Sequence, residues 1–253
     1  NFEKIRNNGF YYVDKTGLIE ELLKTEAEVT LITRPRRFGK TLGMSMLESF
    51  FDIRKNSRKL FEGLEIARQS ELCSKWMNQY PTVSVSFRQV DGLNFTSAYD
   101  MLTMVFADLY NKHLYLLEDS HVTEFQKKTF TNIAHGCGSE KEVKSSLVLL
   151  TTMMQQHYGK AVVLLIDEYD VPVAKASNHG YYNEMLDIMK GIMSTALKDN
   201  QALRFAVITG CLKIAKESIF TGTNNFVSDT IRDSRYNEYF GFTQTEVDKI
   251  LND

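Results

Sequence analysis

The stretch VTLITRPRRFGKT, residues 29–41, decides the fold class. Its first five residues are apolar or β-branched, as in a short buried strand. Its last three are the Gly-Lys-Thr that ends the phosphate-binding pattern G-x-x-x-x-G-K-[ST]. The position of the first glycine, however, is occupied by Arg34, which is followed by Pro35. The loop is therefore either a phosphate-binding loop with an altered first half or a basic surface loop before a helix.

Each residue of this loop has an expected role if phosphate binds there. The Lys40 amine would reach the β- and γ-phosphates, and the Thr41 hydroxyl would bind Mg²⁺. Gly39 would let the backbone approach phosphate at the positive end of a helix expected to run to about Phe51. Pro35 lacks an amide proton, so the altered half offers fewer donors. The candidate nucleotide-binding residues are Arg36, Arg37, Phe38, Gly39, Lys40, Thr41 and Leu42.

A second element with acidic residues is AVVLLIDEYD, residues 161–170. An apolar run leads into Asp167 and Glu168, and ligands of open α/β sheets bind outside the carboxyl ends of the strands. This is the form of a Walker B strand, in which Asp167 would hold Mg²⁺ and Glu168 would polarise an attacking water. A solvent-exposed strand end is the alternative. Because both elements occur in the right order, the sequence favours nucleotide binding.

A third strand, LRFAVITG at 203–210, ends in Thr209 and Gly210. In ATPases that combine such a phosphate-binding loop with a Walker B strand, the end of the corresponding strand carries a polar group that senses the γ-phosphate. A threonine that caps a turn is the alternative. We therefore take Glu168, Lys40 and Thr209 as candidate catalytic residues, and Thr41 and Asp167 as candidate metal ligands.

Strands and helices alternate along the rest of the chain. A further strand is expected at 82–87, and helices are expected at 97–118, at 122–157 with a break near 135–140, and at 181–199. Short apolar strands alternating with helices predict a parallel sheet covered on both faces. We find no internal repeat or proline-rich linker. The sequence therefore predicts one α/β domain over residues 1–253, with the three-layer α/β/α arrangement of a P-loop NTPase and a mostly parallel sheet.

The composition excludes several classes of protein. A hydrophobic content of 43% and a charged content of 25% are typical of globular proteins. The net charge of −2 gives no general attraction to nucleic acid. No apolar run reaches the ~18 residues of a membrane-spanning helix, so no membrane partner is expected. The three cysteines form no C-x-x-C pair, which argues against a disulfide framework and predicts a reducing, cytoplasmic compartment.

Two basic clusters, residues 34–40 and 54–59, leave a nucleic-acid-binding alternative open. Arg36 and Arg37 could instead neutralise phosphate charge or face a protein partner.

Residues farther from the loop could also contact a nucleotide. Arg232 and Arg235 could act as a sensor or an arginine finger, although a solvent-exposed helix face explains them as well. Asp14 or Thr16 is expected to cap a helix, and this segment could instead lie over adenine.

Taken together, five stretches resemble the AAA-ATPase-like family of bacterial proteins. They are YYVDKTGLIEELL at 11–23, RPRRFGKT at 34–41, LIDEYDVPV at 165–173, TGCLKIAKESIFTGTNN at 209–225 and FGFTQTEV at 240–247. The resemblance covers essentially the whole chain and implies an AAA/ASCE-like fold whose Walker A element is rich in arginine. In this family the P-loop domain usually precedes a nuclease-like domain of the PD-(D/E)XK class. We therefore expect the chain to be truncated before a C-terminal lid or that nuclease-like domain, and the nuclease-like domain is a possible partner in cis.

We expect an ATP-binding domain that hydrolyses ATP slowly with Mg²⁺. By resemblance, Lys40 and Thr41 take the phosphate and Mg²⁺ roles, and Asp167 and Glu168 the metal and water roles. One alternative is a nucleotide-gated switch or scaffold without appreciable turnover, acting on a protein partner or through self-association. The other is a nucleic-acid-binding module. The sequence leaves open the pathway, the oligomeric state and the base preference beyond a bias toward adenine.

Overall fold

The computed structural model describes residues 1–211, 219–220 and 225–252 and contains one parallel sheet with the strand order β2-β3-β4-β1-β5. The strands are β1 (Val29–Thr33), β2 (Thr82–Ser86), β3 (Val162–Asp167), β4 (Leu203–Gly210) and β5 (Phe226–Asp229). Every strand pair in this sheet is parallel. The α/β fold with a central parallel sheet is confirmed.

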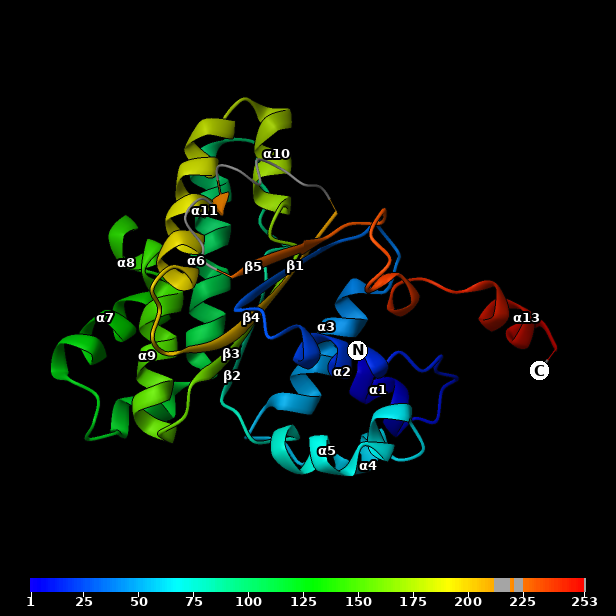
Figure 1. Ribbon diagram of the computed structural model, residues 1–253. Helices are drawn as coiled ribbons and strands as arrows, with labels where there is room; N and C mark the ends of the chain where they lie inside the picture. The colour runs from blue at the N-terminus through cyan, green and yellow to red at the C-terminus, as the bar shows by residue number, and fades with distance from the viewer. Residues whose placement is uncertain (212–218, 221–224, 253) are drawn as a thin grey trace.

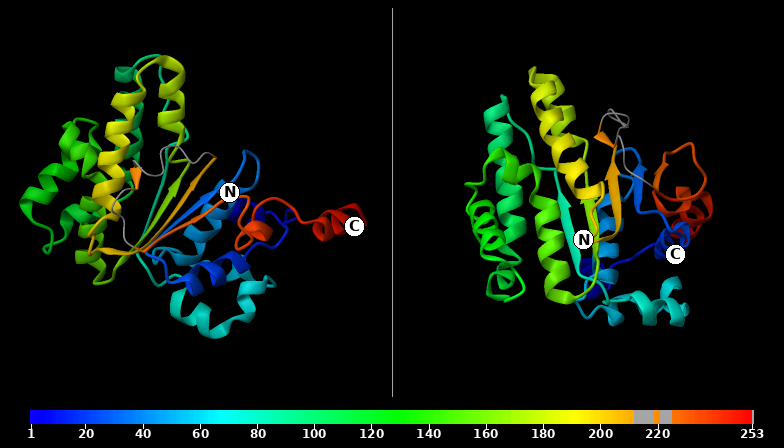
Figure 2. Two further views of the ribbon diagram at one scale, coloured as in Figure 1. Left: turned by 45° about the horizontal axis from the view of Figure 1, so that its top comes forward. Right: turned by 60° about the vertical axis from the view of Figure 1, so that its left-hand side comes forward.

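Helices cover both faces of the sheet (Figures 1 and 2). One face carries α6 (Phe95–Asn111), α7 (Glu124–Ala134), α8 (Glu140–Lys144), α9 (Ser146–Tyr158), α10 (Val171–His179) and α11 (Tyr182–Leu197). The other carries α1 (Phe2–Asn7), α2 (Gly17–Thr25), α3 (Lys40–Phe51), α4 (Arg58–Phe61) and α5 (Ser70–Trp76). Neighbouring residues of β3 point to opposite faces, so Leu164 packs into the first core cluster and Leu165 into the second. Both faces are apolar, which explains the continuous hydrophobic run of this strand.

The strand order brings three chain segments to one edge of the sheet. β4 lies between β1 and β3, with Gly210 opposite Thr33 and Ile208 opposite Ile166. Because parallel strands end at the same edge, the loop after β1, the acidic residues after β3 and the end of β4 lie together. This edge is where ligands of open α/β sheets bind.

Some expected helix boundaries were wrong. The helix expected over 97–118 ends at Asn111, and a 3₁₀ helix, η2 (Leu114–Glu118), follows it. The break expected near 135–140 is present, but α8 and α9 are also separated at Ser145. Ser139 caps α8 through its hydroxyl, in a capping box with Glu142. Local caps of this kind divide a stretch whose apolar spacing alone predicts one helix.

Several elements were not expected from the sequence, and α10 and β5 are the two nearest to the end of β3 and to the loop after β1. The stretch after Glu168 forms helix α10, which begins at Val171 with Pro172 in its first turn. The four residues Phe226–Asp229 form β5, which pairs with β1 at the edge of the sheet. This strand has two apolar residues followed by two polar ones, so apolar and polar side chains do not alternate along it. Tertiary pairing with β1 therefore decides its conformation.

The C-terminal segment returns to the N-terminal helices. After β5 come the 3₁₀ helix η3 (Asn237–Tyr239) and helix α13 (Gln244–Asn252), which projects from the body of the protein in Figure 1. The Lys15 amine lies 2.6 Å from the Glu246 carboxylate and so ties this segment to the start of α2. In the described part of the chain, no helix combines the length and the apolar character needed to cross a membrane.

Candidate functional site

The loop between β1 and α3 has the geometry of a helix start that exposes its backbone. Gly39 is the N-cap of α3 and has a φ of 80°, a conformation that glycine adopts without strain. Arg37 also has a positive φ, of 68°, and its side chain is exposed. A Cβ on Gly39 would meet nothing within 4 Å, so its backbone angle, rather than lack of space, requires a glycine here.

The Lys40 amine lies over the backbone of its own loop. It donates hydrogen bonds to the carbonyl oxygens of Arg34 and Pro35, both at 2.9 Å, and lies 3.2 Å from the Cys211 sulfur. Only 5% of Lys40 is exposed. If phosphate bound here, this buried cation could exchange the two carbonyl oxygens for phosphate oxygens, to which it would bind as a point charge.

Asp167 joins the three segments at this edge of the sheet. One carboxylate oxygen accepts a hydrogen bond from the Thr41 hydroxyl at 2.7 Å, and the other accepts one from the Thr209 hydroxyl. Asp167 is 4% exposed. The residues proposed to hold Mg²⁺ and to sense phosphate are thus in direct contact.

The donor set fits Mg²⁺ better than a transition metal. Thr41 and Asp167 offer hard oxygen ligands, and Mg²⁺ is commonly held by one or two protein oxygens together with substrate phosphates and water. Across the described residues, no group of three or more His, Cys, Asp or Glu side chains could hold a metal by itself.

Glu168 has a strained backbone and a perturbed carboxyl group. Its φ is 53°, which is uncommon for a residue with a side chain, and such strain is concentrated at functional sites. Burial raises the pKa of the Glu168 carboxyl above its usual range, with a further contribution from the Asp167 charge. The positive charges of Arg88 and Lys40 oppose this shift. Arg88, which follows β2, was missed by sequence reasoning because no local motif marks it.

Arg34 points away from the exposed side of the loop. Its guanidinium is buried and forms an ion pair with Asp229 at the end of β5. Asp229 was also missed by sequence reasoning, because β5 itself was not expected. The side chains of Arg36 and Arg37, in contrast, are exposed, and no ion pair involves them within the described residues.

Phe38 and Leu42, the other candidates in the loop, are half-buried and pack against the core cluster under α3. The Phe38 carbonyl accepts a hydrogen bond from the Gly241 amide at 3.0 Å. These two side chains therefore anchor the loop to the core on the α3 side of the sheet.

The remaining sequence candidates lie in three places. Arg232 and Arg235 are exposed, but they lie in turns between β5 and η3, so the expected helix face is wrong. Thr16 is the N-cap of α2 without a capping bond from its side chain, and its buried hydroxyl instead donates to Asp14 and accepts from the Ile66 amide. Most of the stretch 209–225 lies outside the described residues.

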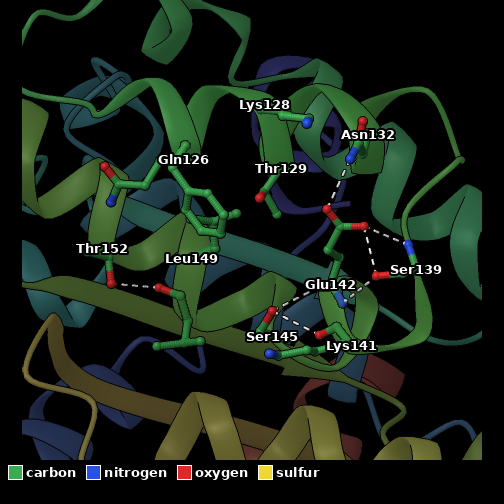
Figure 3. A pocket seen from close by; sticks show the side chains of 12 residues that line it. Gln126, Lys128, Thr129, Asn132, Ser139, Lys141, Glu142, Ser145, Leu149 and Thr152 are labelled. Carbon is green, nitrogen blue, oxygen red and sulfur yellow. Dashed lines mark hydrogen bonds between the residues drawn. The ribbon is translucent and has the colours of Figure 1, made fainter.

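A hollow of about 710 Å³ lies away from this edge, on α7, α8 and α9 (Figure 3). Its lining includes Phe125, Leu149 and Glu142, and the Glu142 carboxylate accepts hydrogen bonds from Ser139 and Asn132 that organise the helix ends. Apolar hollows often mark binding sites. None of the candidate residues lines this one.

The parallel sheet, the Gly-Lys-Thr loop between β1 and α3, and the acidic end of β3 define a P-loop, AAA-like domain. A family model described as "Predicted AAA-ATPase" matches residues 1–220, and the chain belongs to this AAA-ATPase-like family. A protein described as uncharacterized, from the vnfD 5' region of Azotobacter chroococcum mcd 1, is 29% identical over 253 residues. The match covers 99% of this chain and 43% of that relative, so the chain spans less than half of the relative's length.

Proposed function

We propose that this domain binds ATP with Mg²⁺ and hydrolyses it slowly. The observation that carries the proposal is the position of Asp167, whose two oxygens contact Thr41 of the loop and Thr209 of β4. A solvent-exposed strand end would not require this arrangement, because there the carboxylate would face water. Membership of a predicted AAA-ATPase family supports the same conclusion.

The proposed mechanism gives each side chain a separate task. Lys40 exchanges the carbonyls of Arg34 and Pro35 for phosphate oxygens, and the loop amides near Gly39 add donors at the start of α3. Bound Mg²⁺, held by Thr41 and Asp167, would neutralise charge on the β- and γ-phosphate oxygens.

Glu168 orients the attacking water in this proposal. Its raised pKa fits a carboxyl group in a partly desolvated site, where it can accept a proton more readily than an ordinary glutamate. The Thr209 hydroxyl donates a hydrogen bond to one Asp167 carboxylate oxygen and so holds it in place. The other carboxylate oxygen accepts a hydrogen bond from Thr41. We place this chemistry in the cytoplasm, since the three cysteines of the structure are free thiols.

The nucleic-acid alternative loses part of its support in the folded chain. In the second basic cluster, Arg54 pairs with Asp52 and the Lys55 amine lies within 3.0 Å of both Glu3 and Glu48. Carboxylates thus neutralise half of the four basic side chains that would contact a phosphate backbone. The switch alternative is different, because it keeps the same ATP site and differs only in turnover, passing its state to a nuclease-like domain in cis, another protein or a second copy.

Binding and turnover of ATP separate these functions. We would titrate the purified protein calorimetrically with ATP, ADP and GTP, with and without Mg²⁺, and measure phosphate release. Lys40→Ala should remove most of the ATP affinity, whereas Glu168→Gln should keep ATP bound and lower turnover by about 10²-fold or more.

Lys59→Ala removes an exposed lysine far from the loop in sequence and serves as the matched control. An ATP affinity of Lys40→Ala within twofold of the control would contradict the phosphate-loop proposal. Tight ATP binding without turnover in the wild type would select the switch, and ATP-independent DNA binding with a steep salt dependence would select the nucleic-acid module.

A further inference from the structure

The Arg34 side chain makes four contacts in the interior of the protein. One guanidinium nitrogen pairs with the Asp229 carboxylate, and another donates to the carbonyls of Thr33 at 2.9 Å and Asp229 at 3.3 Å. The guanidinium carbon lies 5.4 Å from the centre of the Phe240 ring. Arg34 is 1% exposed and Asp229 is 3% exposed. This single side chain therefore connects β1, β5 and the C-terminal segment.

This ion pair is a costly way to stabilise a fold. Burial raises the pKa of the Asp229 carboxyl even though the Arg34 guanidinium acts in the opposite direction, so desolvation outweighs the attraction. The Nε of Arg34 is also buried and has no hydrogen-bond partner among the described residues. Replacing a buried ion pair with apolar side chains of similar volume is often neutral or stabilising. The pair is better explained by the position that it imposes than by net stability.

The backbone of Arg34 reaches the proposed ATP site directly. Its amide donates to the Gly210 carbonyl at 3.1 Å, beside Thr209, and its carbonyl accepts the hydrogen bond from the Lys40 amine. The buried Arg34 side chain and the carbonyl that accepts the hydrogen bond from Lys40 therefore belong to the same residue. In a standard loop this position is a glycine, which has no side chain and cannot make such a connection.

We propose that Arg34 and Asp229 are a positioning pair that holds the phosphate loop against β5, so that the Lys40 amine is presented to phosphate. The pair also links the loop to the C-terminal segment, because Phe240 contacts Arg34 and Gly241 donates to the Phe38 carbonyl. The assignment rests on the proposed ATP site, but the link between loop and β5 is a property of this chain with or without nucleotide.

The decisive variant is the double substitution Arg34→Met with Asp229→Leu. It replaces the ion pair with apolar side chains, so the melting temperature should stay close to that of the wild type. The loop loses its connection to β5, and we expect ATP affinity to fall by roughly tenfold to a hundredfold, since small displacements at a reacting site have effects of that size. Arg34→Lys keeps the charge and should recover part of the affinity.

Hydrogen exchange of the loop gives a readout that does not depend on ATP. In the double variant, the amides of residues 36–41 should exchange faster than in the wild type, while those of β3 should be unchanged. Wild-type ATP affinity and wild-type loop exchange in a folded double variant would overturn the proposal. If that variant does not fold, the same two measurements on Asp229→Asn, which keeps the side-chain volume and removes the negative charge, decide, and unchanged values would overturn it.

The two proposals fail in different ways. If the wild-type protein does not bind ATP, or if Lys40→Ala leaves its ATP affinity unchanged, the proposed function is wrong. The exchange rates of residues 36–41 would still show whether Arg34 and Asp229 hold the loop.

Discussion

At the scale of single residues, the arginines of the phosphate loop fall into two groups. Arg34 is buried against Asp229, whereas the side chains of Arg36 and Arg37 are exposed next to the Gly39 backbone. Residues that look equivalent in the sequence therefore have different surroundings. The difference matters for function, because an exposed guanidinium can turn toward a phosphate and a buried, paired one cannot.

The exposed pair leads to a prediction about ATP and ADP. If Arg36 or Arg37 contacts the γ-phosphate, Arg36→Ala or Arg37→Ala should weaken ATP binding more than ADP binding, because a planar guanidinium suits phosphate oxygens. The loss should be a few-fold and larger at low salt, where screening is weaker. Calorimetric titrations at two salt concentrations measure it, with Lys59→Ala as the control. Wild-type affinities in both single variants and the double variant would mean that these arginines are not part of the nucleotide site, and would favour a role in a partner surface or in solubility.

At the scale of elements, a buried histidine lies between α6 and η2. His113 is 1% exposed and follows Lys112 where α6 ends. Its Nδ1 lies 3.3 Å from Arg54 and 3.1 Å from the Tyr115 hydroxyl, so the neutral ring can accept a hydrogen bond there. Burial, with the Arg54 charge as a smaller cause, lowers the pKa of His113 to about 3.

The lowered pKa predicts acid sensitivity. An unfolded histidine titrates near pH 6.5, so the stability contributed by neutral His113 is complete above that pH and is lost as pH falls from about 6.5 toward 3. One proton taken up on unfolding gives a slope approaching about 1.4 kcal/mol per pH unit. His113→Gln should flatten this slope in urea unfolding between pH 6.5 and 5, although it lowers stability at pH 7. The exposed His135→Gln is the control, and equal slopes in the two variants would contradict the assignment.

At the scale of the whole molecule, the sheet is shared by two cores. Leu164 belongs to the core under α6, α9 and α11, and Leu165 belongs to the core under α3. Trp76, the single tryptophan, lies in the second core and is stacked on Tyr80 with 4.7 Å between ring centres. Its fluorescence therefore reports on one face of the sheet.

We expect both cores to unfold as one cooperative unit. Leu164→Ala removes side-chain volume on the face opposite Trp76 and should cost about 2–5 kcal/mol of unfolding free energy. The Trp76 fluorescence transition should then shift together with the far-UV circular dichroism transition. Leu165→Ala is the matched variant on the tryptophan side. A Trp76 transition unchanged by Leu164→Ala would show two independently unfolding units.

Much of the fold follows from local pattern. The runs 29–33, 82–86, 162–167 and 203–210 are short and rich in β-branched residues, and all form strands. Burial on both faces explains the continuous apolar run of 162–167. Helix boundaries were less predictable, because the start of α8 depends on the capping box of Ser139 and Glu142, which apolar spacing does not show. The conformation of Phe226–Asp229 required pairing with β1, which no local signal encodes.

The sequence by itself determined which residues could form a phosphate loop and an acidic strand end, because those signals lie within short stretches of chain. It also determined the α/β class, through the alternation of apolar strands with amphipathic helices. Only the tertiary structure decided that Asp167 contacts both Thr41 and Thr209, and that Arg34 pairs with Asp229, 195 residues away. The physical reason is that strand order brings distant segments to one edge of the sheet, and strand order depends on packing of the whole chain.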